Sequence, residues 1–153
     1  MMTLHERIAA IAEHCETILS HFQVKGILEW SCIFCQNEQE FTHYKIDAYM
    51  IGELLEFTPT GPVLRLRSAI LFPQGKIYFI KIRRPDPTRP ELGDCDYAAL
   101  PDWQTAFNST QGKPGFSLIE REKFKMIELK TPGTPARVYF SNPTLGQEHG
   151  ISA

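Results

Sequence analysis

Residues 29–57 read EWSCIFCQNEQEFTHYKIDAYMIGELLEF, and this stretch decides the fold that the sequence predicts. Side chains alternate between the two faces of a strand, so Trp30 and Cys32 would share one face. Asn37 followed three residues later by Glu40 is typical of a helix start. The stretch predicts a strand over 27–35, a helix over 38–50 and a strand over 53–57.

Two more strands follow before a change in composition. Segments 63–72 and 76–82 have strand character, and Pro73-Gln74-Gly75 between them predicts a hairpin. Residues 84–93 contain three prolines and alternating charge, which is typical of an extended linker. The linker is expected to divide one domain into two halves.

The second half repeats this order in shorter form. Asp102 is expected to cap a short helix, and four strands are predicted around it, over 94–100, 116–120, 124–129 and 136–140. An offset of 65 residues aligns Glu29 with Asp94 and superposes the two halves, on element order rather than on identity.

A helix precedes both halves. Thr3 and Glu6 form a capping box, and apolar residues then recur every three or four positions over 4–22, with Gly26 expected to end the helix. The predicted organisation is a single domain with an N-terminal helix (4–26), a first module (27–83), a linker (84–93), a second module (94–141) and a tail (142–153).

Composition narrows the class of protein. The chain has 153 residues, of which 42% are hydrophobic and 22% charged, as in an ordinary globular domain. It has no apolar run long enough to span a bilayer and no leader-like start, so we expect a cytoplasmic protein with no membrane partner. The four cysteines are then expected to be reduced.

The net charge of −2 is unevenly distributed. Residues 63–89 hold 7 basic residues and 1 acidic residue, whereas the flanking segments are acidic. A nucleic-acid partner is nevertheless not expected, because the chain is acidic overall and has no nucleic-acid-binding motif.

The order of elements resembles the vicinal oxygen chelate (VOC) superfamily, which includes glyoxalases, bleomycin-resistance proteins and extradiol dioxygenases. The chain is most similar to its YecM-like branch, which has a leading helix, a first strand of the pattern D-H-I-x-Y-R and a segment beginning G-E-L-L. Residues 29–34 (EWSCIF) and 52–55 (GELL) stand at these places. The resemblance covers most of residues 4–140. It implies an α+β fold in which a leading helix precedes two βαβββ modules that form a curved mixed sheet around a cup.

The family holds a divalent metal in this cup with a first-strand histidine and a last-strand glutamate from each half. Trp30 stands at the first histidine position, and Cys95 or, in another register, Met126 stands at the second. Hard divalent ions need several imidazole or oxygen ligands, so we expect the metal site to be lost and no cofactor to be present. The alternative is an unorthodox divalent metal site made from Cys95, Glu128 and His43.

The candidate ligand-binding residues are Arg65, Arg67, Lys81, Glu128 and Trp30. Arg65 and Arg67 share a strand face and could hold a carboxylate or phosphate, or they could form an exposed basic face with Glu53 and Glu56. Glu128 interrupts an apolar strand, so it either faces solvent or lines the cup and meets an arginine or a ligand.

Three functions follow as hypotheses. The first is a cup that binds a small anionic molecule without a catalytic metal. The second is a metal-dependent lyase, isomerase or dioxygenase of the VOC type. The third is a protein-interaction module, in which the first helix forms a homodimer. The sequence leaves open whether the protein is an enzyme.

Overall fold

The computed structural model describes residues 1–148 of the chain, which form one eight-stranded mixed sheet with the order β2-β3-β4-β1-β5-β8-β7-β6. The helices are α1 (Leu4–Phe22), α2 (Glu38–Ile51), α3 (Trp103–Thr110) and α4 (Leu145–Glu148). The strands are β1 (Lys25–Phe34), β2 (Gly52–Thr58), β3 (Gly61–Phe72), β4 (Gly75–Arg83), β5 (Gly93–Leu100), β6 (Phe116–Glu120), β7 (Lys125–Leu129) and β8 (Ala136–Asn142). The predicted α+β class is confirmed.

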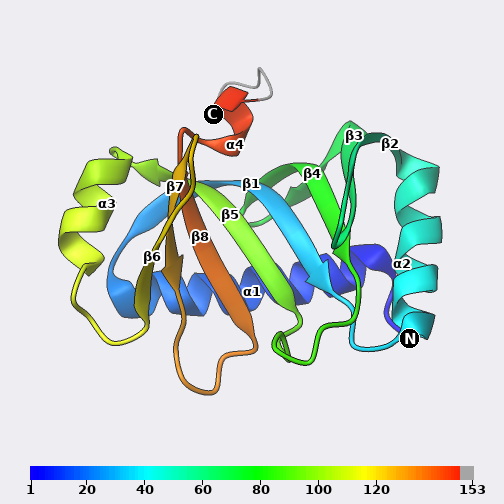
Figure 1. Cartoon of the computed structure of the whole chain (residues 1–153), viewed down its shortest axis with the longest axis horizontal. Helices are drawn as coiled ribbons and strands as arrows, with labels where there is room; N and C mark the ends of the chain where they lie inside the picture. The colour runs from blue at the N-terminus through cyan, green and yellow to red at the C-terminus, as the bar shows by residue number, and fades with distance from the viewer. Residues whose placement is uncertain (149–153) are drawn as a thin grey trace.

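The sheet consists of two modules with the same topology. In each module the first strand pairs parallel with the last, β1 with β4 and β5 with β8, and the remaining pairs are antiparallel. The modules meet where β1 pairs antiparallel with β5. Figure 1 shows the result as a curved sheet with α2 beside one end and α3 beside the other. The predicted pair of βαβββ modules is confirmed.

Helix α1 covers one face of this sheet. Thr3 and Glu6 form the predicted capping box, and the apolar positions of the helix are buried against β1, β5 and β8. Figure 1 shows α1 crossing behind these strands. The apolar face that suggested a helix-mediated dimer is therefore used within the chain. A homodimer stays a prediction, but this face does not supply its contact.

The predicted helical span of residues 4–22 is confirmed, but the residue that caps the end of α1 differs from the expectation. The helix ends at Phe22, and Gln23 adopts a left-handed conformation with φ of 56° as its C-cap. Gly26 lies within β1, where an added Cβ would come within 2.8 Å of Phe140 and Tyr97. This glycine is thus needed for close packing in the strand and not for the helix end.

The predicted offset of 65 residues between the halves is wrong in register. In the β1–β5 pair, Trp30 lies opposite Asp96 and Cys32 lies opposite Asp94. Cys95 faces the other way, toward Cys15 of α1. Because faces alternate along a strand, an error of one residue moved the wrong side chain into the cup.

The linker and the described part of the tail, up to residue 148, lie against the sheet. The linker runs from the end of β4 to the start of β5, and Leu92 bonds to Pro135 through its backbone N–H. The tail includes α4, where the buried Gly146 donates its N–H to Glu29 Oε1 at 3.1 Å. Residues 149–153 of the predicted tail lie outside the described residues. None of the helices in residues 1–148 is long and apolar enough to cross a membrane.

Candidate functional site

A pocket of about 340 Å³ lies on the face of the sheet opposite α1. We call it the cup pocket. Both modules, the linker, the turn between β6 and β7, and α4 contribute to it. Its lining residues are Trp30, Ser31, Cys32, Lys81, Arg83, Arg89, Asp94, Asp96, Ile119, Arg121, Phe124, Met126, Tyr139 and Leu145. A larger hollow of about 660 Å³ lies at the end of α1, but Glu16 and Lys25 are its only charged lining residues within the described chain.

An aromatic pair forms part of the wall. The Trp30 indole stacks on Phe79 of β4, with ring centroids 4.6 Å apart and an angle of 20° between planes. Phe79 is fully buried and Trp30 half-buried. The buried ring fixes the orientation of the indole, which lines the pocket.

Four basic side chains face the same space from three separate segments. Lys81 and Arg83 come from β4, two residues apart and therefore on one face of the strand. Arg89 comes from the linker and Arg121 from the turn between β6 and β7. This arrangement makes the pocket suitable for an anion.

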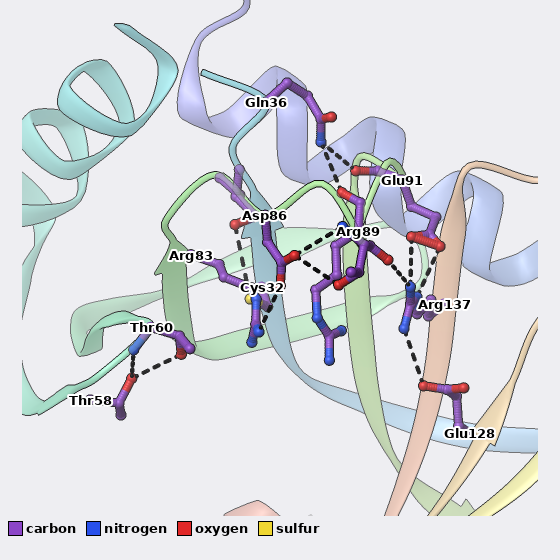
Figure 2. A network of polar contacts seen from close by, with 12 residues as sticks. Cys32, Gln36, Thr58, Thr60, Arg83, Asp86, Arg89, Glu91, Glu128 and Arg137 are labelled. Atoms are coloured by element: carbon purple, nitrogen blue, oxygen red, sulfur yellow. Dashed lines mark hydrogen bonds and ion pairs between the residues drawn. The ribbon is translucent and has the colours of Figure 1, made fainter. Parts of the chain in front are cut away.

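The linker turn that carries Arg89 is held by Asp86. One carboxylate oxygen of Asp86 accepts hydrogen bonds from the Thr88 N–H at 2.9 Å and from its hydroxyl at 2.7 Å. The other oxygen lies 3.4 Å from Arg83 Nη2. The Arg89 N–H donates to the Asp86 carbonyl at 2.9 Å. These bonds, drawn in Figure 2, fix the direction in which Arg89 leaves the turn.

Two further contacts hold the end of the linker. Gln36 donates its side-chain N–H to the Glu91 carbonyl at 2.8 Å and to the Arg89 carbonyl at 3.4 Å. Glu91 binds Arg137 through two charge-assisted bonds of 2.9 Å each. Figure 2 shows Gln36 above the Arg89 side chain and Arg137 beside it.

The Arg89 guanidinium itself lies 5.2 Å from the centre of the Phe34 ring. It forms no ion pair with a carboxylate of residues 1–148. Its charge is therefore supported by an aromatic face and fixed by the linker, yet it retains donors for a ligand.

Two carboxyl groups share the pocket with these cations. Burial raises the pKa of Asp94 to about 7, while Arg89, Lys81, Arg137 and Arg83 oppose this rise. Burial also raises the pKa of Asp96, and repulsion by Asp94 adds to the effect. Asp96 accepts the Ser141 hydroxyl at 3.1 and 3.3 Å. The acids next to the ligand space are thus easily protonated.

Glu128 belongs to a buried network beside the pocket. It accepts the Tyr139 hydroxyl at 2.5 Å and lies 3.4 Å from Arg137 Nη1. Burial and the neighbouring Glu128 raise the pKa of the Tyr139 hydroxyl, and Arg137 has a raised pKa because Glu91 binds its charged form. Glu128 is buried and meets an arginine, as one of the two alternatives expected, but it does not itself line the cup pocket.

The predicted ligand residues divide into two groups. Trp30 and Lys81 line the cup pocket, and Glu128 lies behind its Tyr139 wall. Arg65 is exposed beside Phe79 and Arg67 is paired with Glu53 at 3.7 Å, and neither lines the pocket. The structure thus places Arg65 and Arg67 on an exposed basic surface. This agrees with the second interpretation in that Arg67 pairs with Glu53.

The alternative metal ligands do not come together. Cys95 faces α1, Glu128 is bonded to Arg137, and His43 lies on α2 with its Nε2 3.0 Å from the Met2 carbonyl. Within residues 1–148 there is no group of three histidine, cysteine or acidic residues that could hold a metal ion. The cup offers two acids that burial favours as neutral groups, surrounded by cations that repel a metal. The metal of the VOC family therefore does not fit these residues.

Sequence reasoning missed most of the lining groups. Asp94 and Asp96 alternate with Cys95 and Tyr97, a pattern that already put acids on one strand face. Arg89 was hidden in a segment interpreted as a linker. Arg121 could not be assigned, because nothing in a turn sequence says which way the turn folds.

Comparison with solved structures supports the fold. A chain described as "Structural Genomics, Protein EC4020" has a TM-score of 0.64 and 13% identity, over 86% of this chain and 81% of that one. Another, described as "The crystal structure of a glyoxalase/bleomycin resistance protein/dioxygenase superfamily member from Vibrio splendidus 12B01", has a TM-score of 0.42 and 7% identity, over 77% and 97% of the two chains. The sequence matches no protein-family model and no curated protein.

The topology of the sheet identifies the type of fold. A leading helix followed by two βαβββ modules that form one mixed sheet is what the VOC resemblance implies. The fold is VOC-like. At the identities found, the likeness to solved structures concerns the fold alone.

Proposed function

We propose that the cup pocket binds a small organic anion with a flat, unsaturated part and does so without a catalytic metal. The observation that carries this proposal is the convergence of Lys81, Arg83, Arg89 and Arg121 on a pocket walled by Trp30. The anionic group would lie among the basic side chains and the flat part against the indole.

Preorganisation supports binding. Ordering a flexible arginine costs entropy, which reduces the affinity that its charge provides. Arg89 avoids much of this cost because the Asp86 turn and the contacts of Gln36 and Glu91 already hold its backbone. The pocket volume of about 340 Å³ suits a compound of metabolite size.

The branch within the VOC superfamily, the location in the cell and the oligomeric state are also proposals. The assignment to the YecM-like branch is based on the leading helix and the GELL segment at 52–55. The cytoplasmic location and the homodimer stay predictions. The metal-dependent reaction is the weaker alternative, because the described residues of the cup supply no fitting ligand set.

Benzenesulfonate is a suitable probe, because it combines a flat ring with a charge that does not titrate near neutral pH. Binding would be followed by Trp30 fluorescence in a Trp103→Phe background, since Trp103 is the second tryptophan and lies outside the pocket as the first residue of α3. We expect saturable binding of benzenesulfonate and at least about tenfold weaker binding of the neutral analogue benzamide.

Two variants assign the binding to the pocket. Arg89→Gln should weaken benzenesulfonate binding about tenfold or more, because it removes a fixed charge. Arg84→Gln is the matched control, because Arg84 is exposed, lies over Phe41 and does not line the pocket. Equal affinity for benzamide, or equal loss in both variants, would overturn the proposal.

A further inference from the structure

An acidic pair faces the pocket that we assign to an anion. Asp94 and Asp96 are two residues apart on β5 and so project from the same face, roughly 7 Å apart along the strand. Both line the cup pocket together with its four basic side chains. Two ionised carboxylates here would repel the ligand that the basic groups attract, so the state of these acids controls binding.

The two acids are not equivalent. Asp96 is 5% exposed and already accepts the Ser141 hydroxyl. Asp94 keeps some surface open to the pocket, and its carboxyl group accepts no hydrogen bond from any residue of 1–148. A half-buried carboxyl group without a protein partner is the one that can bond to a ligand.

We propose that the cup takes up one proton with its anion, and that Asp94 holds this proton and donates the resulting O–H to an oxygen of the ligand. The inference rests on the proposed function and narrows the ligand to one with an acceptor oxygen, such as a carboxylate, sulfonate or phosphate group. The proton comes from solvent, and no other bond is formed or broken.

The surroundings of Asp94 single it out as the proton-binding group. The basic groups that face it are Arg89, Lys81, Arg137 and Arg83, and they favour its charged form in the empty pocket. A bound anion offsets their charge, so the pKa of Asp94 rises above its value of about 7 when the ligand arrives. Protonation and binding thus strengthen each other.

Burial disfavours ionisation of the other weak acids at the pocket. Burial raises the pKa of the Cys32 thiol well above its usual value and also raises that of the Tyr139 hydroxyl. Asp96 is buried and repelled by Asp94, which also favours its neutral form. Because Asp96 already accepts the Ser141 hydroxyl, Asp94 is the acid that is left to bond to the ligand.

The sign of the pH dependence follows. Below about pH 7 the empty pocket already carries the Asp94 proton, so affinity is constant. Above it the proton must be taken from solvent, so affinity falls by up to about tenfold per pH unit. The fall ends where the carboxyl group of the complex also ionises.

The experiment measures the Kd of benzenesulfonate between about pH 6 and pH 9. We expect the Kd of the unaltered protein to rise about tenfold or more over this range. Calorimetry in two buffers of different ionisation enthalpy at about pH 8 should report uptake of nearly one proton per ligand. Asp94→Asn should make the Kd constant within about twofold, because the amide donates a hydrogen bond at every pH.

Asp47→Asn is the control, because Asp47 lies on α2 beside His43 and outside the pocket, so this variant should keep the full pH dependence. Binding without pH dependence and without proton uptake would overturn the inference but leave the proposed function intact. No binding at any pH would overturn both. The calorimetry needs no variant, so it decides the matter even if Asp94→Asn does not fold.

Discussion

The two modules share a topology but contribute different chemistry to the cup. The first module supplies an aromatic wall and two cations, Trp30, Lys81 and Arg83. The second supplies one cation, Arg121, together with Asp94, Asp96 and Tyr139. Burial raises the pKa of Asp94, Asp96 accepts the Ser141 hydroxyl, and Tyr139 donates to the buried Glu128. The comparison teaches that the repeated scaffold fixes where side chains point, while each half is free to specialise. In the function that we propose, the first half supplies the aromatic wall and two of the cations for the ligand, and the second supplies the acid that binds the proton.

The largest effect is expected from the buried network of the second module. Arg137→Ala would leave Glu128 and Glu91 without their cation, and the side chains of all three residues are at most 14% exposed. Losing one partner of a buried ion pair typically costs several kcal/mol, so we expect a loss of about 3 kcal/mol in the free energy of unfolding. Urea unfolding followed by circular dichroism measures it.

The control for this prediction is Lys113→Ala, an exposed lysine without an ion pair in the described chain, which should change stability by less than about 0.5 kcal/mol. A loss in Arg137→Ala no larger than in the control would mean that the network does not support the second module.

The next effect concerns the seam where the modules meet. Gly93 starts β5, and a Cβ there would lie 2.2 Å from the Cys32 carbonyl oxygen and 2.6 Å from Ile11 of α1. The Cys32 backbone cannot rotate away from this Cβ as a flexible side chain could. Gly93→Ala should therefore lower the free energy of unfolding by about 2 kcal/mol or more, which thermal and urea unfolding measure.

Gly52→Ala is the matched variant at the sheet edge. A Cβ added at Gly52 would lie 3.0 Å from the Arg65 carbonyl oxygen. Strand β2 has no described strand on its other side. We expect at most about 1 kcal/mol there, because an edge strand can shift. Equal losses at both sites would contradict the idea that the seam is the rigid part.

A smaller and pH-dependent effect separates Asp94 from ordinary surface acids. Its pKa in the folded protein is raised from 3.8 to about 7, so the folded state binds its proton more tightly than the unfolded chain does. Stability from this group is therefore present below about pH 4 and is lost as pH rises toward 7. Asp94→Asn should remove this loss.

The full difference between these pKa values corresponds to roughly 4 kcal/mol, and access of water to the pocket reduces it. We expect Asp94→Asn to be about 2 kcal/mol more stable than the unaltered protein at about pH 8 and equal to it near pH 4. Urea unfolding at the two pH values measures this. A variant that is less stable at both would show that Asp94 is ionised and stabilising in the empty pocket.

The order of helices and strands could be predicted from the sequence, because each of these elements is marked by a local sequence pattern. The Thr3 capping box, the turn at residues 73–75 and the repeated order of strands each predicted a feature that the structure contains. The cap of α1 was wrongly assigned to Gly26, because Gln23 adopts the left-handed conformation that glycine usually takes.

The cup was harder to predict, because a single residue of register exchanges its two faces. Cys95 was expected in the cup, whereas its neighbours Asp94 and Asp96 lie there. Arg89 and Arg121 reach the pocket through loops, whose path depends on long-range contacts such as that of Arg137 with Glu91. Such contacts leave no local pattern in the sequence.

The smallest effect is expected from the arginines that the sequence singled out. Arg67 is 54% exposed and Glu53 77% exposed, at 3.7 Å, and an exposed ion pair contributes less than about 1 kcal/mol. The double variant Arg65→Ala/Arg67→Ala should therefore keep its stability within about 1 kcal/mol and its benzenesulfonate Kd within about twofold. Binding lost in this variant but kept in Arg89→Gln would move the ligand from the seam between the modules to the edge of the first. Both modules would then no longer be needed for one site, and the division of chemistry between them would lose its functional meaning.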